Sequence, residues 1–389
     1  MRNPLSSKVT ELQPSGIRKF FDIVTEMKDA ISLGVGEPDF DTPWHIREEG
    51  IYSLEKGKTV YTSNSGLKEL REEICTYLNR RFGLQYDPYK ETIVTVGGSE
   101  AIDIAFRSML DDGDEVLIPQ PCYVSYLPCA KLAGGVPVVI NLKEENEFRL
   151  TPEELLGAIT EKTKVLILAF PSNPTGAIMN REDLEAIAKV VIEKDIFVIS
   201  DEIYSELSYA EEHVSIASIP GMRERTIVIN GFSKSYAMTG WRLGYACGPK
   251  EIIEQMTKVH QFAIMCAPTT SQYAAVEALK HGDPDVAEMR EAYNNRRRLV
   301  VSSLREMGLS CFEPLGAFYV FPCIKEFGMT SDEFATRLLQ EEKLAVVPGT
   351  AFGDCGEGYL RISYAYSVEQ LKTALERLKN FVERLRNNI

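Results

Sequence analysis

The sequence predicts an α/β protein with a large domain, built on a mostly parallel sheet flanked by helices, and a smaller α/β domain built mainly from the C-terminal part. Short β-rich segments alternate with helical segments through the middle of the chain, which is typical of parallel sheets covered on both faces. Several β-rich segments are apolar throughout, as expected for strands buried on both sides. The 389 residues, 44% of them hydrophobic, are enough for two domains.

The elements of the large domain follow in order along the chain. A helix over residues 99–110 follows a glycine pair, and residues 181–194 form another amphipathic helix. Thr151, Pro152 and Glu154 predict a helix start, because they provide an N-cap, a proline in the first turn and the carboxylate of a capping box. The strands are predicted at residues 92–96, 115–118, 136–140, 165–170, 196–200, 226–229 and 243–247.

The last hundred residues show a different pattern of expected helices and strands from the middle of the chain. A long charged helix over 285–307 is expected to join the two domains, and short strands are predicted around 345–347 and 359–363. A final helix begins at Val368. The arginine run at 296–298 lies on the long helix, and we expect it to form a solvated face.

Composition excludes several classes of protein. The formal net charge is −14, from 43 basic and 57 acidic side chains, and no basic block is present, so nucleic acid and anionic membranes are not expected partners. No apolar run is long enough to span a bilayer, and the first residues lack a secretory signal. We therefore expect a cytoplasmic protein with reduced cysteines. The eight cysteines and four histidines lack zinc-ligand spacing, so no metal site is expected.

Polar residues follow four of the predicted strands at the point where each strand ends. Because ligands bind at the carboxyl ends of strands in open α/β sheets, these residues are expected to meet at one rim if the strands are parallel. A glycine turn before a helix can hold a phosphate, although such a turn alone is weak support. The residues are Gly98 and Ser99 after the first strand, Asn173 after the fourth, Asp201 and Tyr204 after the fifth, and Lys234 after the sixth.

Lys234 differs from the other lysines because it lies in a loop of small residues after an apolar strand. Burial lowers a lysine pKa and makes the amine nucleophilic, as imine chemistry requires. Arg242, eight residues later, has the planar fork that suits a phosphate. If Asp201 is buried, its carboxylate needs a polar or cationic partner. The sequence leaves three candidates for that partner: a protonated pyridine nitrogen, a nearby arginine and a helix N-terminus.

The motifs together resemble the class I aminotransferases, which share the fold of aspartate aminotransferase. The resemblance extends from about residue 10 to residue 380 and is specific because the motifs occur jointly and in family order. The motifs are Gly34-Val35-Gly36-Glu37-Pro38-Asp39-Phe40, Tyr61-x₄-Gly66, Ser172-Asn173-Pro174-Thr175-Gly176, Asp201-x-x-Tyr204, Ser233-Lys234-x₆-Trp241-Arg242-x-Gly244, Gly316-Ala317-Phe318-Tyr319, Val347-Pro348-Gly349 and Tyr359-x-Arg361-Ile362-Ser363.

The resemblance implies the roles of these residues, with pyridoxal 5'-phosphate as cofactor. Lys234 would hold the cofactor and move the substrate proton, and Asp201 would pair with the pyridine nitrogen. It also implies fold type I with a large domain at 46–285 and a small domain, with an N-terminal arm, from 1–45 and 286–389. The remaining roles are Asn173 and Tyr204 at the ring oxygen, Tyr123 on the ring face, Gly98, Ser99, Ser233 and Arg242 at the phosphate, Tyr61 reaching the phosphate of the other subunit of a homodimer, and Arg361, Gly36 and Asn173 at the substrate carboxylate.

The amino donor stays open between several classes. Ser99 stands where relatives that prefer dicarboxylic substrates often carry a lysine, while Ile17, Tyr123 and Phe262 are candidates for an apolar pocket wall. The chain is similar both to aromatic and to N-acetyl-diaminopimelate aminotransferases, with 2-oxoglutarate as the expected acceptor. Alternatives are an aspartate aminotransferase and a C–S lyase on the same fold; a non-enzymatic regulator is disfavoured because no basic recognition helix precedes the motifs.

Overall fold

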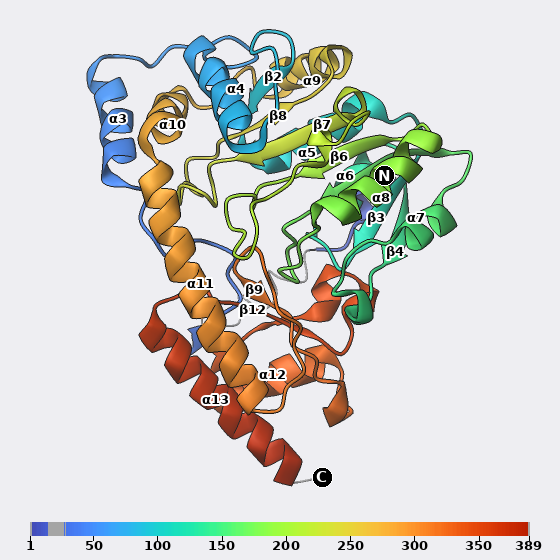
Figure 1. Cartoon of the computed structure of the whole chain (residues 1–389), viewed down its shortest axis with the longest axis vertical. Helices are drawn as coiled ribbons and strands as arrows, with labels where there is room; N and C mark the ends of the chain where they lie inside the picture. The colour runs from blue at the N-terminus through green and yellow to red at the C-terminus, as the bar shows by residue number, and fades with distance from the viewer. Residues whose placement is uncertain (1, 15–26, 28, 388–389) are drawn as a thin grey trace.

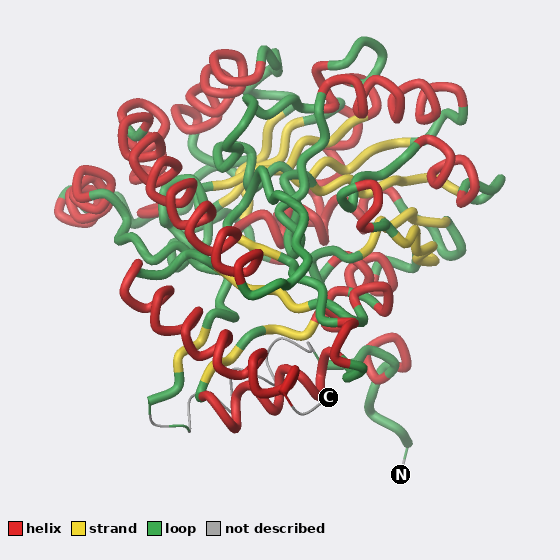
Figure 2. Tube along the Cα trace, turned by 60° about the horizontal axis from the view of Figure 1, so that its bottom comes forward, coloured by secondary structure: helices red, strands yellow, loops and turns green. Residues whose placement is uncertain are grey.

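The computed structural model describes residues 2–14, 27 and 29–387. All seven predicted strands of the large domain are confirmed, and they form one sheet in the order β2-β8-β7-β6-β5-β3-β4 (Figures 1 and 2). β8 is antiparallel to both of its neighbours, whereas the other strands run parallel to one another. The strands are β2 (Thr92–Thr95), β3 (Glu115–Gln120), β4 (Val136–Asn141), β5 (Thr163–Ala169), β6 (Phe197–Asp201), β7 (Thr226–Gly231) and β8 (Gly244–Cys247).

Both faces of the sheet are covered, which explains why its central strands are apolar throughout. Ile167 and Ile199 pack on one face with the core of α5 and α9, and the adjacent Leu166 and Val198 pack on the other face with α8. The predicted capping box is confirmed, since the side chain of Thr151 accepts from the Glu154 amide at 3.2 Å. The helices of this part are α3 (Trp44–Glu55), α4 (Lys68–Phe82), α5 (Gly97–Met109), α6 (Tyr126–Leu132), α7 (Pro152–Ala158), α8 (Arg181–Glu193), α9 (Lys250–Ala263) and α10 (Thr269–His281).

The C-terminal part packs around a second core beside the long helix α11, which runs down from α10 and lies against α13 (Figure 1). A small antiparallel sheet has the order β11-β12-β9, and β1 from the N-terminal segment pairs with β10. The elements are β1 (Ile31–Ser32), α11 (Asp283–Glu306), β9 (Tyr319–Val320), α12 (Ser331–Glu342), β10 (Leu344–Ala345), β11 (Val347–Pro348), β12 (Leu360–Ser363) and α13 (Val368–Asn387).

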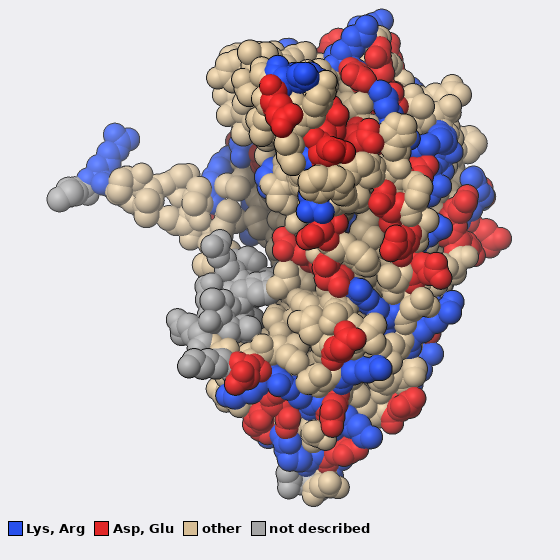
Figure 3. All heavy atoms as spheres, turned by 90° about the vertical axis from the view of Figure 1, so that its left-hand side faces the viewer, with Lys and Arg blue, Asp and Glu red and all other residues tan. Residues whose placement is uncertain are grey.

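Short helices complete the described chain. They are α1 (Ser7–Thr10) and the 3-10 helices η1 (Glu144–Asn146), η2 (Ile216–Ser218), η3 (Arg223–Arg225), η4 (Lys325–Phe327), η5 (Gly349–Phe352) and η6 (Asp354–Gly356). Within the residues described, no helix has both the length and the apolar character that crossing a membrane requires. On the face drawn in Figure 3, Lys and Arg atoms are interspersed with Asp and Glu atoms.

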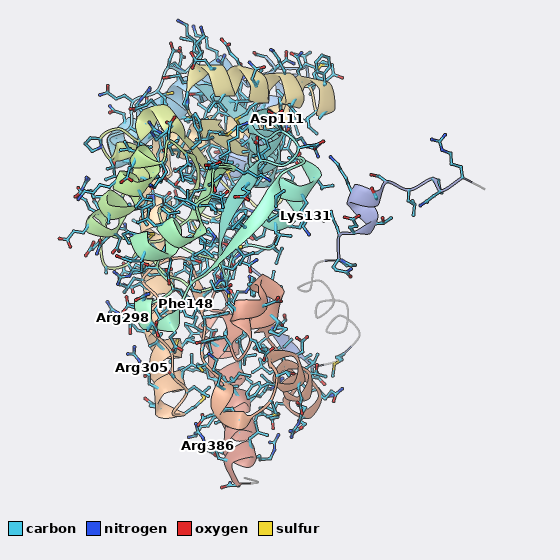
Figure 4. The ribbon with its side chains drawn as sticks, turned by 90° about the vertical axis from the view of Figure 1, so that its right-hand side faces the viewer. Asp111, Lys131, Phe148, Arg298, Arg305 and Arg386 are labelled. Carbon is cyan, nitrogen blue, oxygen red and sulfur yellow. The ribbon has the colours of Figure 1, made fainter. Side chains whose placement is uncertain are left out.

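Two sequence expectations for the C-terminal part are wrong. The single strand expected around 345–347 is two strands that belong to different sheets, because the chain crosses from one sheet to the other at Val346. The arginine run is not a solvated face: Arg296 pairs with Asp39 at 2.6 Å, and the buried Arg297 pairs with Glu313. Only Arg298 of the run, labelled in Figure 4, lies on the exposed side of α11.

The division into domains at 46–285 and at 1–45 with 286–389 stays a proposal. Its support is that Leu33 and the partly buried Ile31 and Phe40 pack with the core of the C-terminal part.

Candidate active site

The parallel strands bring the predicted site residues that follow them to one rim of the large sheet, where Gly36 of the N-terminal segment and Arg361 of the C-terminal part join them. A cavity of about 310 Å³ lies there, between the strand ends and the C-terminal part. Every predicted site residue except Tyr61 lines it; Tyr61 is 77% exposed on the surface. Of the proposed wall residues, Tyr123 lines the cavity, Phe262 is 86% exposed, and Ile17 lies outside the described residues. The lining includes Gly36, Gly98, Ser99, Tyr123, Asn173, Asp201, Tyr204, Ser233, Lys234, Arg242 and Arg361.

Lys234 extends from the loop after β7 into the cavity. Its Nζ donates to the Gly36 carbonyl at 2.6 Å and lies 5.9 Å from the Tyr204 ring centre and 5.8 Å from that of Phe318. Burial lowers the pKa of Lys234 to about 8, with Arg361 and Arg242 acting in the same direction. The neutral fraction of this amine near physiological pH is therefore much larger than that of an ordinary lysine, which suits a nucleophile or a base.

Asp201 ends β6 and is buried. Its Oδ2 accepts from the Tyr126 hydroxyl at 2.7 Å and its Oδ1 from the Ile203 amide at 3.2 Å. Burial raises the pKa of Asp201, and these two donors act against that rise. Within the described chain, no Lys, Arg or His nitrogen lies within 4.0 Å of this carboxylate, so the arginine pair considered from the sequence is absent there.

Arg361 lies on β12 and is only 2% exposed. One guanidinium nitrogen donates to Asn173 Oδ1 at 2.9 Å and another to the Gly34 carbonyl, and the guanidinium carbon lies 4.6 Å from the centre of the Tyr319 ring and 4.7 Å from that of Phe352. Its Nε has no partner, and the described residues provide no carboxylate within 4.0 Å of it. A buried cation without an anion is costly, so the arrangement suits an anionic ligand.

Glycines bring the backbone close to Arg242, which also lines the cavity. Gly97 has φ +78°, and a Cβ there would lie 2.8 Å from the Arg242 guanidinium. A Cβ at Gly244 would lie 2.6 Å from the Gly98 amide nitrogen. Gly98 and Ser99 form the first turn of α5, where backbone N–H groups point out of the helix. With Ser233 and Arg242 beside them, these groups form a cradle that fits a phosphate.

Two tyrosines that line the cavity were not predicted as site residues from the sequence. Tyr126 donates to Asp201, but it stands on a short helix without any motif to mark it. The Tyr319 hydroxyl lies 2.8 Å from that of Tyr204, and a Cβ on Gly36 would lie 2.4 Å from it. Tyr319 ends the motif Gly316-Ala317-Phe318-Tyr319. The motif was recognised in the sequence, but the position of the Tyr319 hydroxyl in the cavity was not predicted.

Comparisons with known proteins show which family the chain resembles. The family described as aminotransferase class I and II matches residues 28–378. The chain is 54% identical over 375 residues to the putative aminotransferase YugH of Bacillus subtilis, covering 96% of this chain and 97% of that protein. It is 51% identical to an aspartate aminotransferase of Pyrococcus abyssi, covering 96% of each. The crystal structure of an aromatic aminotransferase from Pyrococcus horikoshii superimposes with a TM-score of 0.91 at 48% identity, covering 96% of this chain and 100% of the other.

Proposed function

Because this chain belongs to the class I and II aminotransferases, a family that uses pyridoxal phosphate, we propose that it transfers the amino group of an aromatic or other large L-amino acid to a 2-oxo acid such as 2-oxoglutarate by a ping-pong mechanism. One observation carries the proposal: Lys234 and Arg361 face the same cavity. Lys234 provides a buried amine with a lowered pKa, and Arg361 provides a buried guanidinium that has no carboxylate partner in the described chain.

The residues present fit pyridoxal 5'-phosphate. When bound, this cofactor withdraws electrons from the substrate α-carbon, so that its proton can leave. Lys234 would hold the cofactor and then carry that proton between the α-carbon and the cofactor C4′. Asp201, which has two hydrogen-bond donors and no basic partner in the described chain, would face the pyridine nitrogen. Tyr126 would orient the Asp201 carboxylate through the bond at 2.7 Å.

The other cofactor contacts follow from the same cavity. We assign the phosphate to the Gly98 and Ser99 amides, the Ser233 hydroxyl and Arg242. The ring oxygen would be bound by Asn173 and Tyr204, with Tyr123 against the ring face.

Substrate binding would use the opposite end of the cavity. Arg361 would bind the substrate α-carboxylate through two nitrogens, assisted by Asn173 and the Gly36 backbone. The Gly36 carbonyl that accepts from Lys234 belongs to the same segment, so the bound substrate would lie beside the amine.

The charges around the cavity favour a donor without a second carboxylate. Among the described lining residues the cations are Lys234, Arg242 and Arg361, and each already has a role. Glu37 adds a carboxylate to the lining, whereas Tyr123 and Ile102 add apolar surface. A donor side chain that is aromatic or apolar therefore meets less electrostatic opposition than an acidic one.

We also propose a homodimer with shared active sites. Large apolar side chains are exposed on α3, on the loop after it and around the end of α9, and such surface on a folded chain usually marks an interface. A second copy of the chain would cover this apolar face and bring its own Tyr61 to the phosphate cradle. The residues are Trp44, Ile51, Tyr52, Leu54, Val60, Tyr61, Phe262, Ile264 and Met265, defined here as the apolar face.

A half-reaction screen tests the proposed function. The cofactor-loaded protein is mixed with single amino acids without an oxo acid, and the visible absorption of the cofactor is followed. Conversion by Phe or Tyr faster than by Asp is expected, and Lys234→Ala should not convert any donor. Faster conversion by Asp or by N-acetyl-diaminopimelate would overturn the donor class. Pyruvate released from cystathionine without conversion by any donor would overturn transamination in favour of C–S cleavage.

A further inference from the structure

A buried histidine on α9 is connected to the phosphate cradle through a glutamate. His260 is completely buried, and its Nδ1 lies 2.6 Å from Glu100 Oε1. The other oxygen of Glu100 accepts from the Val96 amide at 2.5 Å, at the point where β2 has ended and α5 has not yet begun. Glu100 directly follows Ser99, so this carboxylate lies within one turn of the cradle.

The position of Glu100 creates a competition between two anions. The first N–H groups of a helix lack partners within that helix, and they attract negative charge. In the part of the chain that the structure describes, the amides of Gly98 and Ser99 have no acceptor. A glutamate in the first turn is able to fold back and bind such amides itself, which would place a carboxylate where the phosphate should be.

The hydrogen bonds of Glu100 turn it away from that position. One oxygen is directed to Val96 and the other to His260, so both are used outside the cradle. In the described structure, Glu100 is the only hydrogen-bond partner of the His260 side chain, since the ring Nε2 is buried without a hydrogen bond. The other buried side chains of α9, Ile253 and Met256, are apolar, and a third apolar residue would pack there without leaving a buried nitrogen unpaired.

We propose that His260 is a positioning residue that keeps Glu100 turned back onto Val96, so that the Gly98 and Ser99 amides stay free for the cofactor phosphate. This inference rests on the proposed use of pyridoxal phosphate. It predicts that losing the histidine affects the phosphate of the cofactor and not its ring.

The test compares the affinities of pyridoxal phosphate and pyridoxal, which lacks the phosphate, measured by equilibrium titration of their absorption. His260→Leu should weaken the affinity for pyridoxal phosphate by about tenfold, which is the effect of losing one hydrogen bond to a charged group. The affinity for pyridoxal should stay within about twofold of the wild-type value. His213→Leu is the matched control, because His213 also pairs with a buried glutamate, Glu202, at 3.0 Å. It should change both affinities by the same factor.

A second variant separates competition from general loosening. Adding Glu100→Gln to His260→Leu removes the competing charge and should restore the affinity for pyridoxal phosphate. The inference would be overturned if His260→Leu weakened the affinities for both aldehydes equally or left both unchanged. It would also be overturned if the double variant did not recover the affinity for pyridoxal phosphate. A wild-type protein that binds neither aldehyde would instead overturn the proposed cofactor. Thermal unfolding of each variant confirms that folded protein is compared.

Discussion

At Lys234, burial and neighbouring charges act on a single nitrogen. Burial has the largest effect on its pKa, and Arg361 and Arg242 lower it further, whereas Glu37 and Asp201 raise it. The net pKa of about 8 means that the free amine is abundant at a pH where an ordinary lysine is almost wholly protonated. This shift is a property of the cofactor-free chain and is therefore measurable without turnover.

Acetylation of the cofactor-free protein should reveal this shift. The rate at Lys234, resolved by mass spectrometry, is expected to rise about tenfold per pH unit and to level off near pH 8, because only the neutral amine reacts. The exposed Lys162 in the same sample reports how the reagent itself changes with pH. A rate at Lys234 that still climbs steeply above pH 10 would contradict the lowered pKa.

Arg361 is expected to act on every donor alike. Arg361→Ala should raise KM for all α-amino acids by a similar factor of about a hundredfold, because it removes the proposed two-pronged contact to the carboxylate that all donors share. Arg361→Lys should recover only part of the loss, since an ammonium cannot reproduce the planar fork. The comparison needs one aromatic and one acidic donor, and a loss confined to the acidic donor would refute this placement.

At the scale of elements, His45 ties three helices together. It lies at the start of α3, and its ring nitrogens are 2.8 Å from Glu277 on α10 and 3.0 Å from Asp285 on α11. Burial lowers the pKa of His45, but the hydrogen bonds to Asp285 and Glu277 outweigh it, so the net pKa is raised above 6.5. The stabilisation from this contact is thus fully present below pH 6.5 and is lost as the pH rises through the raised value.

Urea unfolding of His45→Gln should show this pH dependence. The variant is expected to lose more unfolding free energy relative to wild type at about pH 5.5 than at about pH 8.5. His281→Gln is the matched control, because His281 is 64% exposed and 3.9 Å from Glu277, and it should change little at either pH. A larger loss for His45→Gln at the higher pH would contradict the sign.

At the scale of the whole molecule, the dimer proposal predicts complementation between inactive variants. Lys234→Ala lacks the amine proposed to hold the cofactor in its own site, and Tyr61→Ala lacks the hydroxyl proposed to reach the site of the other subunit. In a mixed dimer one site receives both groups, so mixing the variants at limiting cofactor should restore activity.

Sedimentation should show a dimer for wild type and a monomer for Ile51→Glu with Leu54→Glu, which places charges in the apolar face. A fully active monomer would refute the proposal.

The sequence predicts the large sheet well because its strands are long, apolar and separated by capped helices. It fails at β10 and β11, because two-residue strands are too short to show a period, and their sheet is decided by distant partners. The cavity residues that belong to motifs were predicted because a motif is a local sequence pattern. Tyr126 and His260 were missed because no such pattern marks them. A hydrogen bond between residues 75 or 160 positions apart leaves no local pattern. Arg297 was misassigned because its partner Glu313 lies on another segment.

The reversed direction of β8 has a consequence for how the two ends of the cavity are supported. β7 and β8 are adjacent and antiparallel, and Gly231 is opposite Gly244, so residues 232–243 form one loop closed at its base by the sheet. Lys234 and Arg242 both lie on this loop. Arg361 lies on the small sheet of the C-terminal part. If the proposed roles hold, a shift of that small sheet against the large one would move Arg361 away from the substrate while Lys234 and Arg242 keep a fixed spacing at the cofactor, so that a product could depart and the cofactor stay behind.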